Sequence, residues 1–367
     1  MTAISVVMPC HNRDYDLLRV LEAYDAQRGQ VSFELIAIDD ASTDDTHDVL
    51  KSYRPRHYSL RVERFEENQG PAAARNRGIS LVQAPLLLFV GDDILPSADF
   101  VQGHVAAHRE QPDLEVAILG QTVWGKKIPQ NTLMQHIDGV GAEQFSYYYL
   151  QDGHEYDFRH LYTSNISLKR DFLCSLDRWF DTEFAYAAFE DVELAYRLAK
   201  HGLRIVYRSA LMAEHSHYHT IWSFSTRQYR AGLMAWVLVR KHPLAAFRVF
   251  RLNHRRILKF FRYRGPILDT LIMSTLETQL LHLLSFYEWN YHALLDDLYV
   301  QALEYFYVKG VLDGIVGNSA RNARVHTAHL RAALIPLLSG FIGQAHAEDI
   351  PLPLGLEQFL SRHTPFF

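Results

Sequence analysis

Two adjacent carboxylates, Asp92 and Asp93, follow an apolar run from Leu86 to Val90, with only Gly91 between. A continuous apolar run of this length, opened by Pro85, is typical of a strand covered on both faces of a parallel sheet. The carboxyl end of such a strand is where ligands bind in open α/β sheets. Neighbouring carboxylates repel each other there, so they favour a cation or a hydroxyl-rich ligand. An ordinary Asp-rich turn is the alternative that this motif alone leaves open.

A second acidic pair, Glu190-Asp191, begins a predicted helix. Asp191 shares one helix face with Leu194, Ala195 and Leu198, which predicts that it lies on the inward stripe. The dipole at a helix N-terminus favours an ionised carboxylate, as a general base requires. The alternative is that the pair only stabilises the start of the helix.

Three histidines alternate after a predicted short strand at Leu203–Tyr207, at positions His215, His217 and His219. Alternation along an extended chain points the three side chains the same way, so they can offer an imidazole to a divalent metal. Zinc is the competing interpretation, although the two cysteines lie far from this cluster in sequence and no paired spacing exists.

Polar or small residues also follow the other predicted strands. After the first strand, a proline-stiffened turn carries Pro9, Cys10, His11, Asn12 and Arg13. After the second, Asp40 can accept hydrogen bonds from a base or ribose, while Ser42 or Thr43 caps the next helix. After the third, residues 68–76 open a helix with small residues that present backbone donors and Arg75 to a phosphate.

The elements that must position these groups alternate between strand and helix up to about Tyr207. This alternation predicts a parallel sheet with right-handed crossovers, whose strand-end loops gather along one edge. The expected domain spans residues 1–220. Strands are predicted at Ile4–Met8, Phe33–Ile38, Leu60–Phe65 and Pro85–Val90, and helices at Asp14–Gln27, Asp44–Ser52 and Pro71–Val82.

Residues 221–367 form a predicted all-helical region. From Arg240 to Arg264 there are nine Lys or Arg and no Asp or Glu, with phenylalanines and leucines at helical spacing. Such a basic amphipathic helix suits an anionic membrane surface or a lipid-phosphate acceptor, and equally a helix packed on the catalytic domain with a solvated basic flank. Later apolar helices are candidates for a homodimer interface.

The composition, 48% hydrophobic and 22% charged over 367 residues, is that of a globular chain with room for two regions. A net charge of -5 gives no global attraction to nucleic acid. Two cysteines are too few for a disulfide framework, which favours a reducing cytosol. No basic leader segment is evident and the apolar stretches are shorter than the ~20 residues of a spanning helix. The expected location is cytoplasmic, or peripheral on the inner face of a membrane.

Taken together and in order, these motifs resemble those of a bacterial family 2 glycosyltransferase. The resemblance covers about residues 1–220 and implies the GT-A fold, a Rossmann-like mixed α/β sheet that binds nucleotide-diphospho-sugars. It does not extend over the helical region. The matching stretches are Val6–Arg13, Ile38–Asp44, Asn68–Asn76, Phe89–Pro96, Thr163–Ser167, Phe180–Phe184 and Phe189–Leu194.

The resemblance implies a nucleotide-sugar site in which Asp40 reads the base and Asp92 contacts the ribose. Asp93 would coordinate a divalent cation, Mn²⁺ or Mg²⁺, with His215 as a further ligand and His217 as its fallback. The family more usually has Asp-x-Asp-Asp at this point, and Val90 replaces the first Asp here, which leaves the division between the two carboxylates open. The remaining residues implied to line the nucleotide-sugar site are Pro9, His11, Asn12, Arg13, Arg75 and Asn76.

By the same resemblance, Asp191 is the catalytic base of an inverting transfer. Glu190, Asn165 and Trp179 would contact the acceptor or the donor sugar, although Trp179 beside Phe180 suits the core equally well.

The predicted function is metal-dependent, inverting transfer of a sugar from a nucleotide-diphosphate sugar, with a UDP-sugar as the expected donor. The acceptor would be a glycan or lipid-linked hydroxyl in bacterial surface-glycan or glycoconjugate synthesis. The alternatives are a retaining transferase on the same scaffold, a sugar nucleotidyltransferase, and a non-catalytic nucleotide-sugar or glycan-binding protein.

Overall fold

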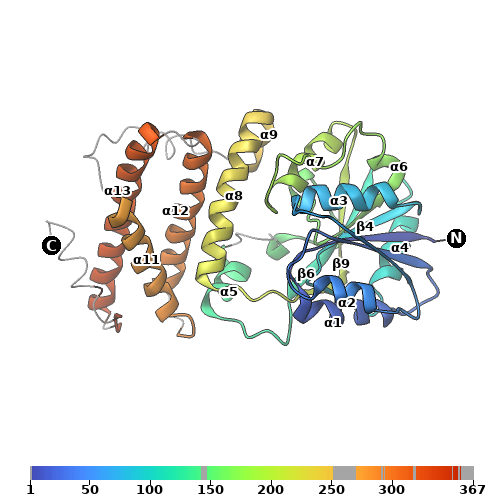
Figure 1. The fold of residues 1–367 in the computed structure, drawn as a ribbon, viewed down its shortest axis with the longest axis horizontal. Coiled ribbons are helices and arrows are strands. Elements are labelled where there is room, and N and C mark those ends of the chain that lie inside the picture. The colour runs from blue at the N-terminus through green and yellow to red at the C-terminus, as the bar shows by residue number, and fades with distance from the viewer. Residues whose placement is uncertain are drawn as a thin grey trace. The chain divides into compact units, whose positions relative to one another are not determined.

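The chain divides into two compact units in a computed structural model (Figure 1). The first consists of residues 1–129 and 146–218, and the second of residues 130–145 and 219–367. The structure describes residues 2–141, 147–250, 270–290, 292, 294–316, 320–348, 350–353 and 356.

The first unit is built on a nine-stranded sheet in the order β3-β2-β1-β4-β8-β6-β9-β5, with β7 paired to β9. The first four strands of this order are parallel, and β8 is antiparallel to both β4 and β6. The sheet is therefore mixed, as the resemblance implied, and the prediction of a parallel sheet is correct for β3, β2, β1 and β4 and for the pair of β6 and β9. The strands are β1 (Ile4–Cys10), β2 (Phe33–Asp39), β3 (Ser59–Arg64), β4 (Leu86–Val90), β5 (Ile94–Pro96), β6 (Val116–Trp124), β7 (Glu155–Tyr156), β8 (Asn165–Lys169) and β9 (Arg204–His215).

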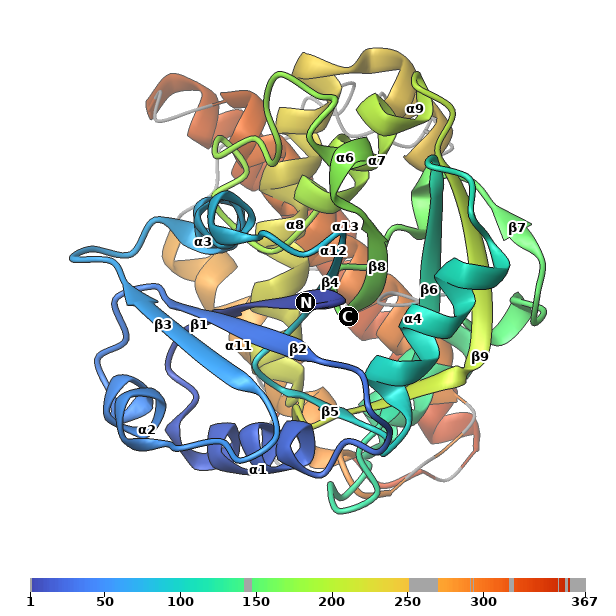
Figure 2. The same cartoon turned by 90° about the vertical axis from the view of Figure 1, so that its right-hand side faces the viewer.

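The central strands are covered on both faces, which explains their apolar sequences. All five residues of β4 are buried, as the run from Leu86 to Val90 predicts. Helices α1 and α2 lie on one face of the sheet and α3 lies on the other (Figure 2). Close packing of α3 on β1 requires Gly78, because a Cβ there would lie 2.4 Å from Val7 Cγ1. The helices of this unit are α1 (Asp14–Asp25), α2 (Thr46–Ser52), α3 (Gly70–Leu81), α4 (Phe100–Glu110), α6 (Arg170–Leu173) and α7 (Glu190–Ala199).

β9 extends well beyond the strand predicted at Leu203–Tyr207. A register shift against β6 between Gly120 and Gln121 accommodates an irregularity, so pairing continues to His215. The strand ends there, and the alternation predicted for the three histidines does not reach the last of them. His219 is buried and packs edge-on against Phe224, 5.1 Å between ring centroids.

In the described part of the second unit every regular element is helical, as predicted. Residues 130–145 join this unit although they lie inside the predicted 1–220 domain, because long-range contacts hold them there. Asn131 donates to the carbonyl of His219 and to Glu288, and His136 contacts Asp296 at 2.9 Å. The helices are α5 (Thr132–His136), α8 (Ile221–Lys241), α9 (Pro243–Phe250), α11 (Thr270–Phe286), α12 (Leu294–Val316) and α13 (Ala320–Ala347).

Among the described helices, none combines the length and the apolar character needed to cross a membrane. Residues 240–250 of the basic segment end α8 and form α9. Residues 251–264 of that segment lie outside the described residues.

Candidate active site

The loops that follow β1, β2 and β4 are hydrogen-bonded to one another at one edge of the sheet. The His11 N–H donates to Asp92 Oδ2 (3.0 Å), and the Asn12 N–H donates to Ser42 Oγ (3.1 Å). Pro9 belongs to β1 itself and leads directly into this loop. The ends of these strands therefore lie together, as the sequence predicted, and direct hydrogen bonds join their loops.

The buried Asp40 carboxylate is engaged by the start of α3. It accepts hydrogen bonds from the N–H groups of Gln69 (2.7 Å) and Gly70 (2.8 Å), and its own N–H donates to the Cys10 carbonyl (2.8 Å). This carboxylate satisfies N–H groups at a helix N-terminus that would otherwise lack partners. Asp40 thus fixes the loop after β2 on α3, a role that sequence reasoning did not assign to it.

Asp92 and Asp93 are bridged by one arginine. Arg13 Nε lies 3.5 Å from Asp92 Oδ1, and Arg13 Nη2 lies 3.1 Å from Asp93 Oδ2. Burial and the neighbouring Asp93 raise the pKa of Asp92 to about 6. Burial alone would raise the pKa of Asp93 too, but His215 and Arg13 hold it well below its usual range. The two carboxylates therefore differ in pKa, and Asp93 stays ionised at a lower pH than Asp92 does.

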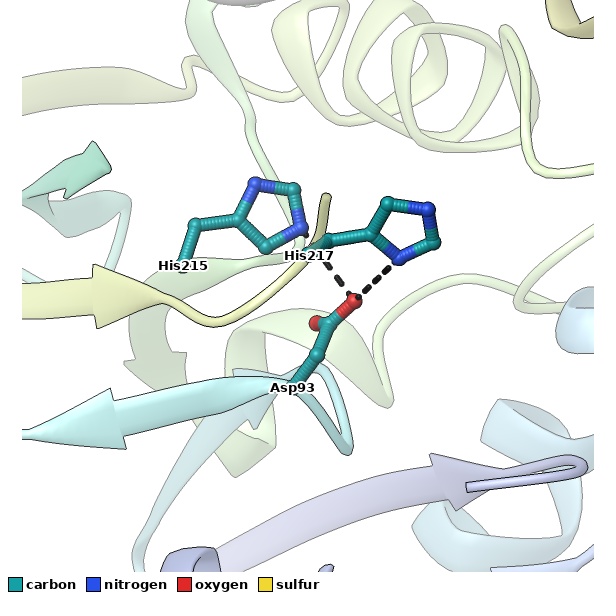
Figure 3. Close-up of side chains that lie close together, drawn as sticks. All are labelled: Asp93, His215 and His217. Carbon is teal, nitrogen blue, oxygen red and sulfur yellow. Dashed lines mark hydrogen bonds and ion pairs between the residues drawn. The ribbon is translucent and has the colours of Figure 1, made fainter. Parts of the chain in front are cut away.

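Asp93, His215 and His217 present ligand atoms that all lie within 4.8 Å of one another. Figure 3 shows both imidazoles directed at Asp93 Oδ2, with His215 Nε2 at 3.2 Å and His217 Nδ1 at 3.4 Å. Trp124 stacks on the His215 ring at 5.3 Å and fixes its plane. A carboxylate oxygen with two imidazole nitrogens suits Mn²⁺ and matches Mg²⁺ less well, since Mg²⁺ prefers oxygen ligands. The structure brings together both histidines that sequence reasoning had offered as alternatives.

Asp191 lies in the first turn of α7, partly accessible to solvent. Its carboxylate accepts a hydrogen bond from the N–H of Val192 (2.7 Å), and the main chain of Thr163 lies near enough to lower its pKa. Burial, followed by the charge of Glu190, raises the pKa of Asp191 to about 7. Burial and Glu190 therefore favour the protonated carboxyl up to about neutral pH, whereas the position at a helix N-terminus led us to expect an ionised one.

The main chain of Thr163 lies near Asp191 and precedes the strand beside the Asp92-Asp93 turn. Two residues after Thr163, Asn165 begins β8 and pairs with Val90, the last residue of β4. Gly91, Asp92 and Asp93 follow directly. The candidate base thus lies near the segment that leads into β8, and the two carboxylates follow the adjacent strand β4.

The raised pKa of Asp191 predicts a pH-dependent effect on stability. Between the ordinary value of 3.8 and about 7, the unfolded chain is ionised at this residue while the folded protein holds the proton. Folding stability from this group therefore falls as the pH rises through that window and stays low above it. Asp191→Asn removes the penalty, so we expect its Tm at pH 8 to exceed that of the wild type by roughly a few degrees. Calorimetry at pH 4 should show no such gain, and a gain of equal size at both pH values would contradict this account.

Arg75 and Glu190 form a buried ion pair between α3 and the start of α7. Arg75 Nη1 lies 2.8 Å from Glu190 Oε1, and the guanidinium lies over the Phe180 ring at 5.4 Å. Asn76 reinforces this contact, since its side chain donates to the Phe180 carbonyl (2.8 Å) and accepts from the Phe180 N–H (2.9 Å). All three predicted site residues therefore support the segment that carries Asp191.

Breaking this ion pair should cost much stability. Arg75→Met leaves Glu190 charged and buried without its partner, so we expect a loss of about 3–5 kcal/mol in the free energy of unfolding, measured in urea. Arg77→Met is the matched control on the same helix, because Arg77 pairs with Glu63 at 2.7 Å on the surface and 43% of its side chain is exposed. That control should cost no more than about 1 kcal/mol. Similar losses in the two variants would contradict the role given to Arg75.

The main chain of Asn165 lies at this edge beside Val90, but its side chain is directed into the sheet. Asn165 is fully buried, where its amide donates to the carbonyls of Gln121 (3.0 Å) and Leu211 (2.9 Å) and its oxygen contacts His104 (3.0 Å). Its side chain therefore joins β8 to β6 and β9 and has no polar atom left for a sugar. Trp179 is partly buried, and its carbonyl accepts a hydrogen bond from Arg197 of α7.

Three of the described non-glycine residues have a left-handed backbone, and all adjoin these loops: Asn12 (φ 52°), Ala41 (φ 55°) and Phe189 (φ 66°). Strained conformations of this kind concentrate at functional sites. Asn tolerates such a φ, so the sequence carries a signal at position 12. Sequence reasoning missed Ala41 and Phe189, because neither residue type favours this conformation.

The mixed α/β sheet, the paired carboxylates after β4 and the acidic start of α7 form the arrangement that the resemblance to the GT-A fold implied. Residues 5–174 match the family model of glycosyl transferase family 2. This part of the chain is therefore similar to that family, as its ordered motifs implied.

Curated relatives share part of this sequence, and a solved structure shares the fold. Validoxylamine A glucosyltransferase of Streptomyces hygroscopicus subsp. limoneus is 31% identical over 273 residues, which cover 65% of this chain and 57% of that protein. Poly(ribitol-phosphate) beta-glucosyltransferase of Bacillus spizizenii is 30% identical over 134 residues, 35% of this chain and 20% of that protein. The matched regions thus span less than two thirds of either relative. Staphylococcus aureus TarS 1-349 shares the fold, with a TM-score of 0.51, 17% identity and 92% of both chains covered.

Proposed function

We propose that this chain is a metal-dependent, inverting glycosyltransferase that moves a sugar from a nucleotide-diphosphate sugar to an acceptor hydroxyl. The observation that carries the proposal is Asp191. Its carboxylate has a pKa raised to about 7 and lies near the main chain of Thr163, two residues before the start of the strand that pairs with β4. Perturbed carboxylates at the carboxyl edge of a sheet are typical of acid–base chemistry.

Asp191 acts as the general base. Its carboxylate takes the proton of the acceptor hydroxyl as that oxygen forms a bond to the anomeric carbon of the donor sugar. The bond from that carbon to the diphosphate breaks, and its electron pair leaves with the diphosphate. A base with a pKa near the working pH combines a useful ionised fraction with a strong affinity for the proton.

The donor side is formed by the loops after β1, β2 and β4. His11 and Asn12 border the nucleotide, and Asp40 holds their neighbouring loop in place. Asp93, His215 and His217 would hold a divalent cation, which neutralises negative charge on the leaving diphosphate. A UDP-sugar is the proposed donor.

The names of the relatives support the acceptor class. One acts on validoxylamine A and another on poly(ribitol-phosphate), and both are bacterial glucosyltransferases. We therefore propose a hydroxyl-bearing glycan, polyol or lipid-linked acceptor in bacterial surface-glycan or glycoconjugate synthesis.

The direct experiment has a binding step and a product step. Calorimetry with UDP, GDP, dTDP and CDP, each with and without Mn²⁺ or Mg²⁺, should find one nucleotide whose binding requires the metal. Proton NMR of the product made from the matching sugar nucleotide should show an anomeric configuration opposite to that of the donor. Retention of configuration would identify a retaining enzyme, and release of pyrophosphate a nucleotidyltransferase. No metal-dependent binding of any of the four would overturn the proposal.

The proposed base predicts the pH profile of transfer. Because Asp191 must be deprotonated, kcat/KM should rise with pH, reach half its maximum near 7 and then level off. Deprotonation of Asp92, whose pKa is about 6, is the other process that would make kcat/KM rise with pH. The Asp92→Asn variant should keep the limb near 7 if Asp191 causes it. A profile that is flat from pH 5 to 9 would contradict the assignment.

A further inference from the structure

The Arg13 guanidinium contacts two of the three side chains that would hold the cation, Asp93 and His217. Its Nη2 donates to Asp93 Oδ2 (3.1 Å), and its Nη1 contacts His217 Nδ1 (3.1 Å). Its Nε adds a contact of 3.5 Å to Asp92 Oδ1. The two terminal nitrogens of one guanidinium therefore satisfy the same carboxylate oxygen and the same imidazole nitrogen that a metal ion would need.

This arrangement and metal coordination exclude each other. A guanidinium has no acceptor atom, so the contact with His217 requires Nδ1 to present its lone pair. An imidazole nitrogen has only one lone pair, which cannot serve Arg13 and a metal together. The site is also poorly screened, because only 14% of the Arg13 side chain and 13% of Asp93 are exposed, so two cations side by side would repel strongly.

Arg13 has the freedom to leave without disturbing the fold. Its backbone N–H is held by Thr46 Oγ1 (2.6 Å) at the start of α1, so movement is confined to the side chain. Nη1 also donates to the hydroxyl oxygen of Tyr15 at 3.2 Å, and Tyr15 is 66% exposed. One end of the guanidinium is therefore already directed toward solvent.

We propose that Arg13 is an exchangeable cation of this site. In the nucleotide-free protein it neutralises Asp92 and Asp93; when a divalent cation enters, it releases Asp93 and His217 and pairs with the diphosphate of the donor. This inference rests on the proposed function and adds a regulation to it. Arg13 suppresses metal binding until a nucleoside diphosphate is present, so the two ligands bind with positive coupling, and by linkage each strengthens the other by the same factor.

The test is a titration of Mn²⁺, followed by electron paramagnetic resonance, with and without UDP. We expect Arg13→Gln to bind Mn²⁺ about tenfold more tightly than the wild type without UDP, a typical size for such coupling. UDP should then strengthen Mn²⁺ binding by a smaller factor in the variant than in the wild type. Arg13→Lys keeps the charge but cannot make both contacts with one planar group. Its affinity for Mn²⁺ should lie between those of the wild type and Arg13→Gln. Arg77→Gln removes the same charge from α3 and should match the wild type.

Each outcome decides the matter. If Arg13→Gln binds Mn²⁺ no more tightly than the wild type, and the wild type transfers sugar, the exchange is wrong and the proposed function stands. If no variant binds Mn²⁺ with or without UDP, the proposed metal dependence and this inference both fall. Crystals of the wild type soaked in Mn²⁺ test the same point should Arg13→Gln not fold. The anomalous signal should lie at Asp93 with Arg13 turned away, and Arg13 still bonded to His217 beside the ion would overturn the proposal.

Discussion

Asp191→Asn is expected to lower the rate of sugar transfer by about 10²–10⁴-fold while leaving nucleoside diphosphate binding near the wild-type level. The carboxamide has the size of the carboxylate but cannot accept the proton of the acceptor hydroxyl. It also keeps an oxygen for the hydrogen bond from Val192, so the start of α7 should stay in place. The loss should therefore appear in turnover rather than in the affinity for nucleotide.

The measurement is kcat for transfer together with the Kd of the nucleoside diphosphate in Mn²⁺. Glu190→Gln is the informative companion, because Glu190 is the buried partner of Arg75 and not the proposed base. Glu190→Gln should lower the free energy of unfolding, while the transfer rate per folded molecule should change less. Unchanged turnover in Asp191→Asn would remove this residue as the base, whatever the result at Glu190.

The parts of the site that depend on local sequence were predictable. The apolar run of β4 fixed the position of Asp92 and Asp93, because a strand buried on both faces has an unambiguous pattern and an evident end. The first turn of α7 was equally visible, since Asp191 and Leu194 share a helix face. The ordered motifs then indicated the resemblance to family 2 glycosyltransferases, which no single motif could have done.

The parts that depend on long-range pairing were not predictable from the same patterns. Arg75 and Glu190 are separated by 115 positions, and nothing in either motif shows that they neutralise each other. Asn165 was placed with the ligands because it belongs to a matching motif, yet its position in β8 directs it into the sheet. The same limit applies to Arg13, whose type suits a phosphate but whose partners here are carboxylates.

Burial alters the protonation state that the sequence predicts for Asp191, although its place in the first turn of α7 is as predicted. Helix dipole reasoning predicts an ionised Asp191, and that argument considers only the residue's own helix. The neighbouring carboxylate of Glu190 and the loss of water act in the opposite direction and are stronger. Sequence spacing locates a candidate base, but its pKa is set by contacts that only the folded chain brings together.

Asp93→Asn is expected to abolish metal-dependent nucleotide binding and to lower transfer by at least about 100-fold, more than the loss of a group that only supports a ligand. Asp93 Oδ2 is the atom shared by His215, His217 and Arg13, so neutralising it removes the centre of the candidate metal set. Losing either histidine alone would leave that oxygen and one imidazole.

Asp44→Asn is the matched control for Asp93→Asn, because Asp44 lies in the loop after β2 and accepts hydrogen bonds from the main chain of Asp14 (3.3 Å) and Thr46 (3.0 Å). It should cost helix-start stability and leave the Mn²⁺ dependence of UDP binding intact. Calorimetry of UDP with and without Mn²⁺ on the two variants makes the comparison. If Asp92→Asn loses the metal dependence and Asp93→Asn keeps it, the two carboxylates exchange roles, and the histidines beside Asp93 would then serve the diphosphate directly.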